Sequence, residues 1–189
     1  MKKNSKPPKN TDRSTAKILS SEMIYEGPVF GLRRDQVIEP SGLQVTREVI
    51  THPGSVVVLP VLPDGGIVMI RQYRHATRQY LWELVAGRID AGENPKQAAA
   101  RELMEETGYH SKKYKIFLDV FPTPGFLEER MYLLLASNVT PGIAHPEEDE
   151  KITAKIFKKK ELEQMIHRGK LRDAKSIAGL LYYFRFLSR

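Results

Sequence analysis

The segment 87–109, GRIDAGENPKQAAARELMEETGY, constrains the fold of this chain more than any other stretch. Asn94 is a favourable helix N-cap, Pro95 suits the first helical position, and Gln97 completes a capping-box pattern. A run of strong helix formers follows and stops at Gly108, a residue type common just after a helix. The segment therefore predicts a helix over about 95–107, entered from a loop that begins at Gly87.

The same segment carries five carboxylates against three basic side chains. Glu102 and Glu106 lie four residues apart and Glu105 lies three residues from Glu102, so the three acids share one face of the predicted helix. Arg101 and Glu105 form an i,i+4 pair, and Glu93 reaches the same region from the loop. A hard divalent cation with oxygen ligands, Mg²⁺ or Mn²⁺, would relieve the repulsion between these acids. The alternative is a solvated helix face, and the acids alone do not exclude it.

Composition limits the other classes of function. The chain has 189 residues, of which 41% are apolar and 28% charged, which indicates one globular domain with a small extension. It has no cysteine, so disulfides, thiolate metal sites and cysteine nucleophiles are excluded. No apolar run approaches the roughly 18 residues of a membrane helix, and no secretory signal is evident. We therefore expect a cytoplasmic protein.

The net charge of +7 is concentrated near the N-terminus. Residues 1–17 carry six basic side chains and one acidic one, which accounts for +5 of the total. This stretch has almost nothing apolar to bury, so we predict a disordered basic tail. Contact of the tail with nucleic acid is the less favoured interpretation, because solvated tails of this kind are common.

Short strands separated by turn signals fill much of the remaining chain. We predict two strands within 29–50 around a turn at 39–42, strands at 55–62 and 67–74 around a turn at 64–66, and a single short strand at 81–87. Further strands are expected near 114–121, 130–138 and 152–158, and helices near 159–168 and 174–187. Strands and helices that do not strictly alternate indicate an α+β layered domain.

The full pattern of the acidic segment resembles the signature of the Nudix hydrolases at every fixed position. With average residue usage, its chance occurrence in a chain of this length is on the order of one in a million or rarer. The resemblance implies an α+β Nudix fold, in which a mixed β-sheet is sandwiched between α-helices, here with an N-terminal antiparallel sheet extension. The matched positions are Gly87, Glu93, Arg101, Glu102, Leu103, Glu105, Glu106, Gly108 and Tyr109, the last standing where an aliphatic residue is usual.

By the same resemblance, the enzyme cleaves a nucleoside diphosphate linked to another group with the help of Mg²⁺ or Mn²⁺. Glu102 and Glu106 are then metal ligands, Glu105 or Glu93 assists, and the carbonyl of Ala86 completes the shell. Glu106 is also counted as catalytic. The assignment agrees with the chemistry, because metal charge neutralises pyrophosphate oxygens and orients a water for in-line attack.

Three further stretches resemble the ADP-ribose pyrophosphatase branch: RQYRHATRQYLWELVAGRIDAGE, PTPGFLEER and HPEEDEKI. Pro124 stands 15 positions after Tyr109, where this branch carries a marker proline. The resemblance implies hydrolysis of ADP-ribose to AMP and ribose 5-phosphate by a homodimer that exchanges its N-terminal sheets. The corresponding division of the chain is a tail at 1–17, a dimerisation region at 18–50 and a catalytic domain at 51–189.

Five residues are candidates for substrate binding. Arg47 and Glu48 match positions that help to form the substrate site, and Arg74 matches an arginine that contacts phosphate. A guanidinium suits that role because it stays charged and binds pairs of oxygens. Phe30 is a candidate for stacking on adenine, and Glu129 for supporting metal or substrate. Surface ion pairing of the arginines and core packing of Phe30 remain open as alternatives.

An acidic loop at 147–150 precedes the strand expected near 152. In the ADP-ribose pyrophosphatase branch a glutamate of this loop is thought to activate water. Glu150 aligns best with that role and Glu148 is second. Such a carboxylate would accept a proton from a water whose pKa a metal has lowered. A plain acidic loop is the alternative.

Three functions therefore compete. The first is hydrolysis of ADP-ribose, and the second is hydrolysis of another nucleotide sugar or dinucleotide, such as GDP-mannose or NADH. Fold and motif do not choose between them. The third is a non-catalytic nucleotide-binding or RNA-associated module, which would be expected to lose acids of the motif that this chain keeps.

Overall fold

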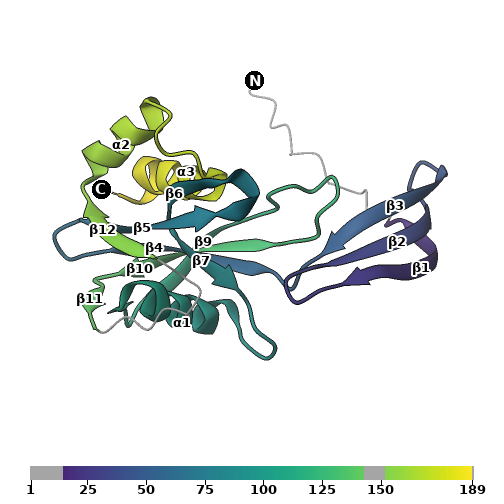
Figure 1. Ribbon diagram of the computed structural model, residues 1–189, viewed down its shortest axis with the longest axis horizontal. Helices are drawn as coiled ribbons and strands as arrows, with labels where there is room; N and C mark the ends of the chain where they lie inside the picture. Colours follow the sequence, from purple (N-terminus) through teal and green to yellow (C-terminus); the bar gives the residue numbers. More distant parts are fainter. Residues whose placement is uncertain (1–14, 143–151, 189) are drawn as a thin grey trace, which may run out of the picture. The chain divides into compact units, whose positions relative to one another are not determined.

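A computed structural model describes residues 15–142 and 152–188 of the chain (Figure 1). The chain divides into two compact units, residues 1–52 with 125–127 and residues 53–124 with 128–189. The helix over 95–107 and its neighbouring strands belong to the second unit. The predicted tail falls largely on residues outside the described part, and the first strand begins at Lys17.

The first unit is an antiparallel sheet in the order β1-β2-β3. This confirms the N-terminal antiparallel sheet that the resemblance implied, with one strand more than the two predicted within 29–50. Its strands are β1 (Lys17–Glu26), β2 (Gly31–Ile38) and β3 (Gln44–Thr51). The predicted turn at 39–42 closes through the Gly42 amide, which donates to the Glu39 carbonyl at 2.8 Å. Asp35 and Val37 are the buried polar and apolar side chains of β2, whereas every residue of β1 is exposed.

The second unit is built on a seven-stranded mixed sheet. Its main path runs β12-β5-β4-β10-β9, and only β10 lies parallel to its neighbour β4 among the pairs of this sheet in the described residues. The strands on this path are β4 (Ser55–Val61), β5 (Ile67–Arg74), β9 (Tyr114–Val120), β10 (Met131–Ser137) and β12 (Thr153–Phe157). The remaining short elements are β8 (Tyr109–His110), β11 (Thr140–Pro141) and the 3-10 turn η1 (His75–Thr77).

The single strand predicted at 81–87 is wrong. The segment forms two strands, β6 (Gln79–Glu83) and β7 (Val85–Arg88), which meet at the fully buried Leu84. β6 pairs with β5 and β7 pairs with β4, because β4 and β5 diverge beyond their contact at Val61 and Ile67. No Gly or Pro stands between Leu81 and Ala86, so the sequence gave no signal for this change of partner.

Helices cover both faces of the sheet (Figure 1). Ala98, Ala99 and Leu103 of α1 (Pro95–Thr107) pack with one set of alternating strand side chains, and Leu162 of α2 (Lys159–His167) and Leu180 of α3 (Ala174–Tyr182) pack with the other set. α3 continues into a π-helical turn, η2 (Tyr183–Leu187). The predicted mixed sheet between helices is therefore confirmed. No helix in the described ranges is long and apolar enough to span a membrane.

The local sequence explains why α1 lies where it does. Asn94 accepts hydrogen bonds from the amides of Lys96 and Gln97, and the Gln97 side chain accepts from the Asn94 amide, so the capping box is complete. Gly108 ends the helix with φ of 72°, the left-handed conformation that glycine adopts without strain. The predicted helix over 95–107 is confirmed at both ends.

Candidate active site

The acids of α1 lie against strand β7. Ala98, Ala99 and Leu103 bury one side of the helix completely, and Glu102 and Glu106 are the acids that lie next to the backbone of β7. Glu106 is 5% exposed, and its Oε2 accepts a hydrogen bond from the amide of Ala86 at 3.4 Å. The sequence predicted a metal-binding role for the carbonyl of Ala86, and that role stays a prediction.

Gly87 makes room for the carboxylate of Glu102. A Cβ built on Gly87 would lie 1.9 Å from Oε1 of Glu102 and 2.0 Å from its carboxyl carbon. No side chain fits at Gly87 while the carboxylate keeps this position. The first fixed glycine of the motif therefore has a steric reason: it lets an acid of α1 approach the backbone of β7.

We call Glu93, Glu102, Glu105 and Glu106 the acidic cluster. Arg101 binds the first three of these acids. Its Nε and Nη2 donate to Oε1 and Oε2 of Glu93 at 3.0 and 2.9 Å, and its Nη1 donates to Glu102 at 2.7 Å and to Glu105 at 3.1 Å. Nη2 also donates to the carbonyl of Arg88 at 3.0 Å. The Glu93 hydrogen bond is the main reason that the pKa of Arg101 is raised, and it holds the pKa of Glu93 below its ordinary value. One guanidinium thus holds Glu93, Glu102 and Glu105 close together.

The donors of this cluster suit a hard cation. In residues 15–142 and 152–188, no three His, Asp or Glu side chains are already close enough to count as a metal site. Arg101 supplies the positive charge between the acids instead. The side-chain donors of the cluster are nevertheless all carboxylate oxygens. The absence of a side chain at Gly87 lets the Glu102 carboxylate lie next to the backbone of β7. Oxygen ligands of this kind fit Mg²⁺ or Mn²⁺.

Arg74, the predicted phosphate contact, ends β5 and forms a two-point ion pair with the buried Glu83. Nε donates to Oε1 at 2.8 Å and Nη2 to Oε2 at 2.9 Å. The pKa of Arg74 is raised, first by the Glu83 hydrogen bond and, among weaker causes, by the charge of Glu106. Arg74 therefore lies within electrostatic reach of the acidic cluster.

Three predicted substrate residues lie in the first unit, where each has a neighbour. Arg47 donates to Glu39 from Nε at 3.0 Å, and Glu48 accepts from Nε of Arg34 at 3.0 Å. The ring of Phe30 lies 5.7 Å from that of Tyr25 and is 45% exposed. These surface pairs match the alternative that the sequence left open for Arg47, and the substrate roles remain predictions.

Of the remaining candidates, only Glu129 falls in the described part of the chain. It is 9% exposed, and its Oε1 accepts a hydrogen bond from the hydroxyl of Ser55 at 2.5 Å. Ser55 pairs with Arg88 between β4 and β7, so Glu129 lies at the end of the sheet where β7 leads into the loop at 89–94 before α1. Glu148 and Glu150, the predicted bases, lie outside the described residues.

The sequence missed two contributions to this region. It predicted the contact of Arg101 with Glu105 from their spacing, but not the contacts of Arg101 with Glu93 and Glu102. It also missed Lys175, whose ammonium group contacts the Glu83 carboxylate from a position 92 residues away. The fixed arginine of the motif was a sequence signal that could have predicted the additional contacts of Arg101. No local sequence pattern predicts the contact of Lys175 with Glu83.

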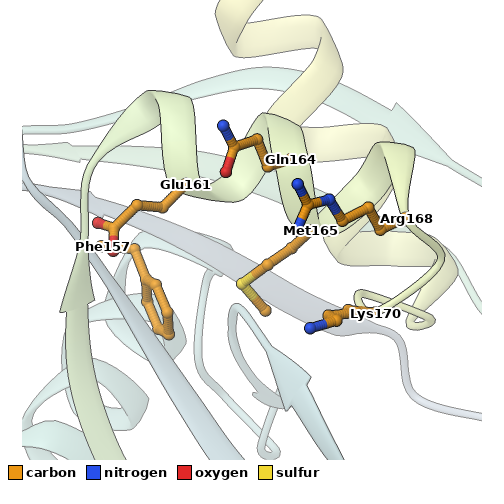
Figure 2. Close-up of a pocket in the computed structure, with 6 residues that line it drawn as sticks. All are labelled: Phe157, Glu161, Gln164, Met165, Arg168 and Lys170. Carbon is orange, nitrogen blue, oxygen red and sulfur yellow. The ribbon is translucent and has the colours of Figure 1, made fainter.

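A small pocket lies on the face of the sheet that α2 and α3 cover, opposite the face that carries α1 and its acids. It has a volume of about 190 Å³ and lies on α2 and the chain on either side of it (Figure 2). Phe157 and Met165 belong to the core on the α2 and α3 side, whereas α1 packs on the opposite side. The residues that line it are Phe157, Glu161, Gln164, Met165, Arg168 and Lys170.

Comparison with known proteins agrees with this geometry. Residues 51–180 match the NUDIX domain, and residues 17–50 match the nucleoside diphosphate sugar hydrolase N-terminal domain. The chain is 39% identical over 168 residues to a protein of Mycobacterium tuberculosis named ADP-ribose pyrophosphatase, covering 86% of this chain and 80% of the relative. It is 32% identical over 168 residues to a Bacillus subtilis protein of the same name, covering 88% and 91%.

A solved structure described as an ADP compounds hydrolase has the same fold. It superposes with a TM-score of 0.79 and covers 92% of this chain and 95% of the other, at 21% sequence identity. The Nudix motif lies at β7, its loop and α1, inside the matched domain. Together, the match over 51–180 and the relatives above 30% identity show that this chain belongs to the Nudix family, with a nucleoside diphosphate sugar hydrolase N-terminal domain preceding its NUDIX domain.

Proposed function

We propose that this protein hydrolyses the pyrophosphate bond of ADP-ribose to AMP and ribose 5-phosphate with the help of Mg²⁺ or Mn²⁺. The acidic cluster that Arg101 gathers against β7 is the observation that carries the proposal. The relative from M. tuberculosis named ADP-ribose pyrophosphatase supports the choice of substrate, because the likeness extends over 80% of its length.

Glu102 and Glu106 are the proposed metal ligands, with Glu93 or Glu105 assisting and the Ala86 carbonyl completing the shell. The metal would neutralise pyrophosphate charge and lower the pKa of the attacking water. Arg101 holds Glu93, Glu102 and Glu105 close together before the metal binds, since it donates to all three. The buried position of Glu106 excludes most of the water that would weaken its interactions.

Arg74 is proposed to orient a substrate phosphate. Two of its nitrogens are engaged by Glu83, but a guanidinium carries five N–H groups and a second edge that matches a pair of phosphate oxygens. Arg47, Glu48 and Phe30 are proposed to bind the nucleotide end, and Glu129 to support the metal or the substrate. The ion pairs of Arg47 and Glu48 would rearrange when substrate binds.

Glu150, with Glu148 as the second choice, is proposed to be the general base. A carboxylate within reach of the attacking water accepts its proton as the bond to phosphorus forms. The test is to change each acid singly to Gln. A large fall in kcat for one variant, with the metal concentration for half-activation unchanged, supports a single base. Equal activity of the two variants contradicts it.

The chain is also proposed to divide into a tail at 1–17, a dimerisation region at 18–50 and a catalytic domain at 51–189. The exposed apolar side chains of β1 support a homodimer formed through the N-terminal sheet. Ile18, Met23 and Tyr25 are 60%, 50% and 50% exposed. Large apolar side chains that gather on a surface are typical of an interaction site.

Product analysis tests the proposed activity. The purified protein is incubated with ADP-ribose and Mg²⁺, beside GDP-mannose, NADH and a metal-free control. Metal-dependent release of AMP that is fastest from ADP-ribose is the expected result. Faster turnover of another member of the panel would assign a different substrate. Absence of turnover on all three would leave two alternatives, a substrate outside the panel or a nucleotide-binding module.

A further inference from the structure

Glu83 is a buried carboxylate with two cationic partners. It ends β6, is 1% exposed, and its two oxygens accept from Nε and Nη2 of Arg74. The ammonium group of Lys175 donates to the same Oε2 from the start of α3. Burial by itself would raise the pKa of Glu83, but the hydrogen bonds and charges of Arg74 and Lys175 outweigh burial and lower it. Glu83 is therefore held as an anion between a strand and a helix.

Lys175 is itself fixed by the N-terminus of α3. Its Nζ lies 2.9 Å from Oδ1 of Asp173, and Oδ2 of Asp173 accepts from the amide and the hydroxyl of Ser176 at 3.0 and 2.5 Å. The Ser176 hydroxyl in turn accepts from the amide of Leu84 at 2.7 Å. The start of α3 thus holds both the side chain of Glu83 and the backbone of the next residue, where the chain passes from β6 to β7.

The arrangement has a direct consequence for Arg74. Glu83 engages the guanidinium along the Nε–Nη2 edge, and the described residues record no further side-chain hydrogen bond from Arg74. The Arg74 side chain is 40% exposed, whereas that of Lys175 is 13% exposed. Lys175 is therefore the inner partner of Glu83, and Arg74 is the partner with an edge left for an incoming oxyanion.

Glu83 shares its negative charge between Arg74 and Lys175, and this affects the position of Arg74. With Arg74 as the sole counter-ion, a buried carboxylate would draw the guanidinium inward to compensate its lost hydration. Lys175 supplies part of that compensation from the other side. Arg74 can then keep a fixed orientation in which its remaining N–H groups are available to a phosphate.

We propose that Lys175 is a positioning residue for pyrophosphate cleavage: it holds Glu83 from α3, and Glu83 holds the Arg74 guanidinium in the orientation that receives a substrate phosphate. The proposal rests on the proposed function and adds to it a residue outside the Nudix motif. Lys175 itself touches neither substrate nor metal in this account. Its influence reaches the reaction only through Glu83 and Arg74.

The first test compares Lys175→Met with Lys175→Arg. The Met variant removes the charge and should raise the KM for ADP-ribose and lower kcat/KM by roughly 10- to 100-fold, because small misplacement of a binding group has effects of that size. The Arg variant restores a cation to Glu83 and should recover most of the loss. Lys160→Met, on the exposed side of α2, is the control for loss of a lysine charge and should behave as the wild type.

A double-mutant cycle separates positioning from general stability. In an Arg74→Met background, Lys175→Met should cause no further loss of kcat/KM, although it should still lower the melting temperature. If Lys175→Met does not fold, Lys175→Gln keeps a donor group at this position and is used in the same cycle.

Two results would overturn the proposal. One is wild-type kcat/KM in Lys175→Met. The other is a loss of kcat/KM on Lys175→Met that is as large in the Arg74→Met background as in the wild type. Wild-type protein that releases no AMP from ADP-ribose would instead refute the proposed function and, with it, this inference. The wild-type assay therefore distinguishes the two failures.

Discussion

The guanidinium of Arg101 meets the carboxylate of Glu93 along a full edge, with Nε 3.0 Å from Oε1 and Nη2 2.9 Å from Oε2. Glu93 lies in the loop before α1, and Arg101 lies two turns into the helix. This pair therefore fixes the loop to the helix at the point where the acids gather. The same guanidinium reaches Glu102 and Glu105, so the spacing of the acids depends on it.

Substitution Arg101→Lys should show how far the arrangement of the acids depends on the planar shape of the guanidinium. Lysine keeps the positive charge, but its single ammonium group cannot reproduce the paired hydrogen bonds to Glu93 together with those to Glu102 and Glu105. Loss of a group that orients metal ligands typically lowers activity or metal affinity by about 10- to 100-fold. We expect a fall of that order in kcat, or in apparent Mg²⁺ affinity, measured by ADP-ribose turnover against Mg²⁺ concentration. Arg168→Lys on the α2 side is the matched control, and equal kinetics for the two variants would contradict this role.

Substitution Glu106→Gln should abolish most of the activity while leaving the fold intact. The side chain is 5% exposed and already accepts from the Ala86 amide, a contact that the neutral amide oxygen of Gln can keep. Loss of a metal ligand removes charge stabilisation of several kcal/mol, so kcat should fall by roughly 10³-fold or more. The measurement is kcat at saturating Mg²⁺ beside a thermal melt. Near-normal turnover would show that Glu106 is no ligand, and Glu163→Gln on α2 should leave both readings unchanged.

Substitution Gly87→Ala tests the approach of Glu102 to β7. The added methyl group would overlap Oε1 of Glu102 at 1.9 Å, so the carboxylate must move. Because the obstacle is the end of a side chain, we expect a small change in melting temperature and a loss of activity comparable with that of Glu102→Gln. The measurement pairs kcat with the melting temperature.

Gly125→Ala provides the comparison, since a Cβ there meets nothing within 4 Å. Full activity of Gly87→Ala would mean that Glu102 acts from another position than the one in this structure.

Local sequence was sufficient to predict α1, because both ends of the helix are fixed by residues within it or beside it. Asn94, Gln97 and Gly108 supply the cap and the stop, and their contacts lie within a few residues. The acidic motif could also be identified from the sequence, because it is defined by the spacing of residues within one continuous segment. The match of 51–180 to the NUDIX domain confirms it.

Two features could not be read from the sequence, for a common reason. The division of 81–87 into β6 and β7 depends on the divergence of β4 and β5, and no breaker stands at Leu84. The contact between Glu83 and Lys175 joins positions 92 residues apart, so only the packing of α3 on the sheet creates it. Each depends on tertiary structure that overrides a locally plausible pattern.

The buried Glu83 should make stability depend on pH at the acid end. Its pKa in the folded protein lies below the ordinary 4.5, so its ionised pairs stabilise the fold above that pH and the stabilisation is lost as pH falls through the folded pKa. Glu83→Gln should lower the free energy of unfolding at neutral pH by about 3–5 kcal/mol, the usual effect of removing one partner of a buried pair. The difference in free energy of unfolding between Glu83→Gln and the wild type should become smaller at acid pH, because protonated Glu83 is neutral like Gln.

Urea denaturation from neutral pH down to about pH 3 measures this difference. Glu163→Gln, exposed on α2, should follow the wild type throughout. A difference that stays constant across the whole range would show that the effect of Glu83→Gln comes from packing and not from charge.

Strand β1 should be the part of the molecule that a second copy covers. It is an edge strand of ten residues, all exposed, and carries Ile18 and Ile24 at 60% and 40% exposure. A long apolar edge left uncovered invites uncontrolled pairing, so proteins cover or charge such edges. Ile18→Lys with Ile24→Lys should therefore convert a dimer into a monomer, measured as a halved mass by light scattering after gel filtration. Ser41→Lys, in the turn between β2 and β3, controls for added charge, and a wild-type chain that is already monomeric would contradict the proposed dimer.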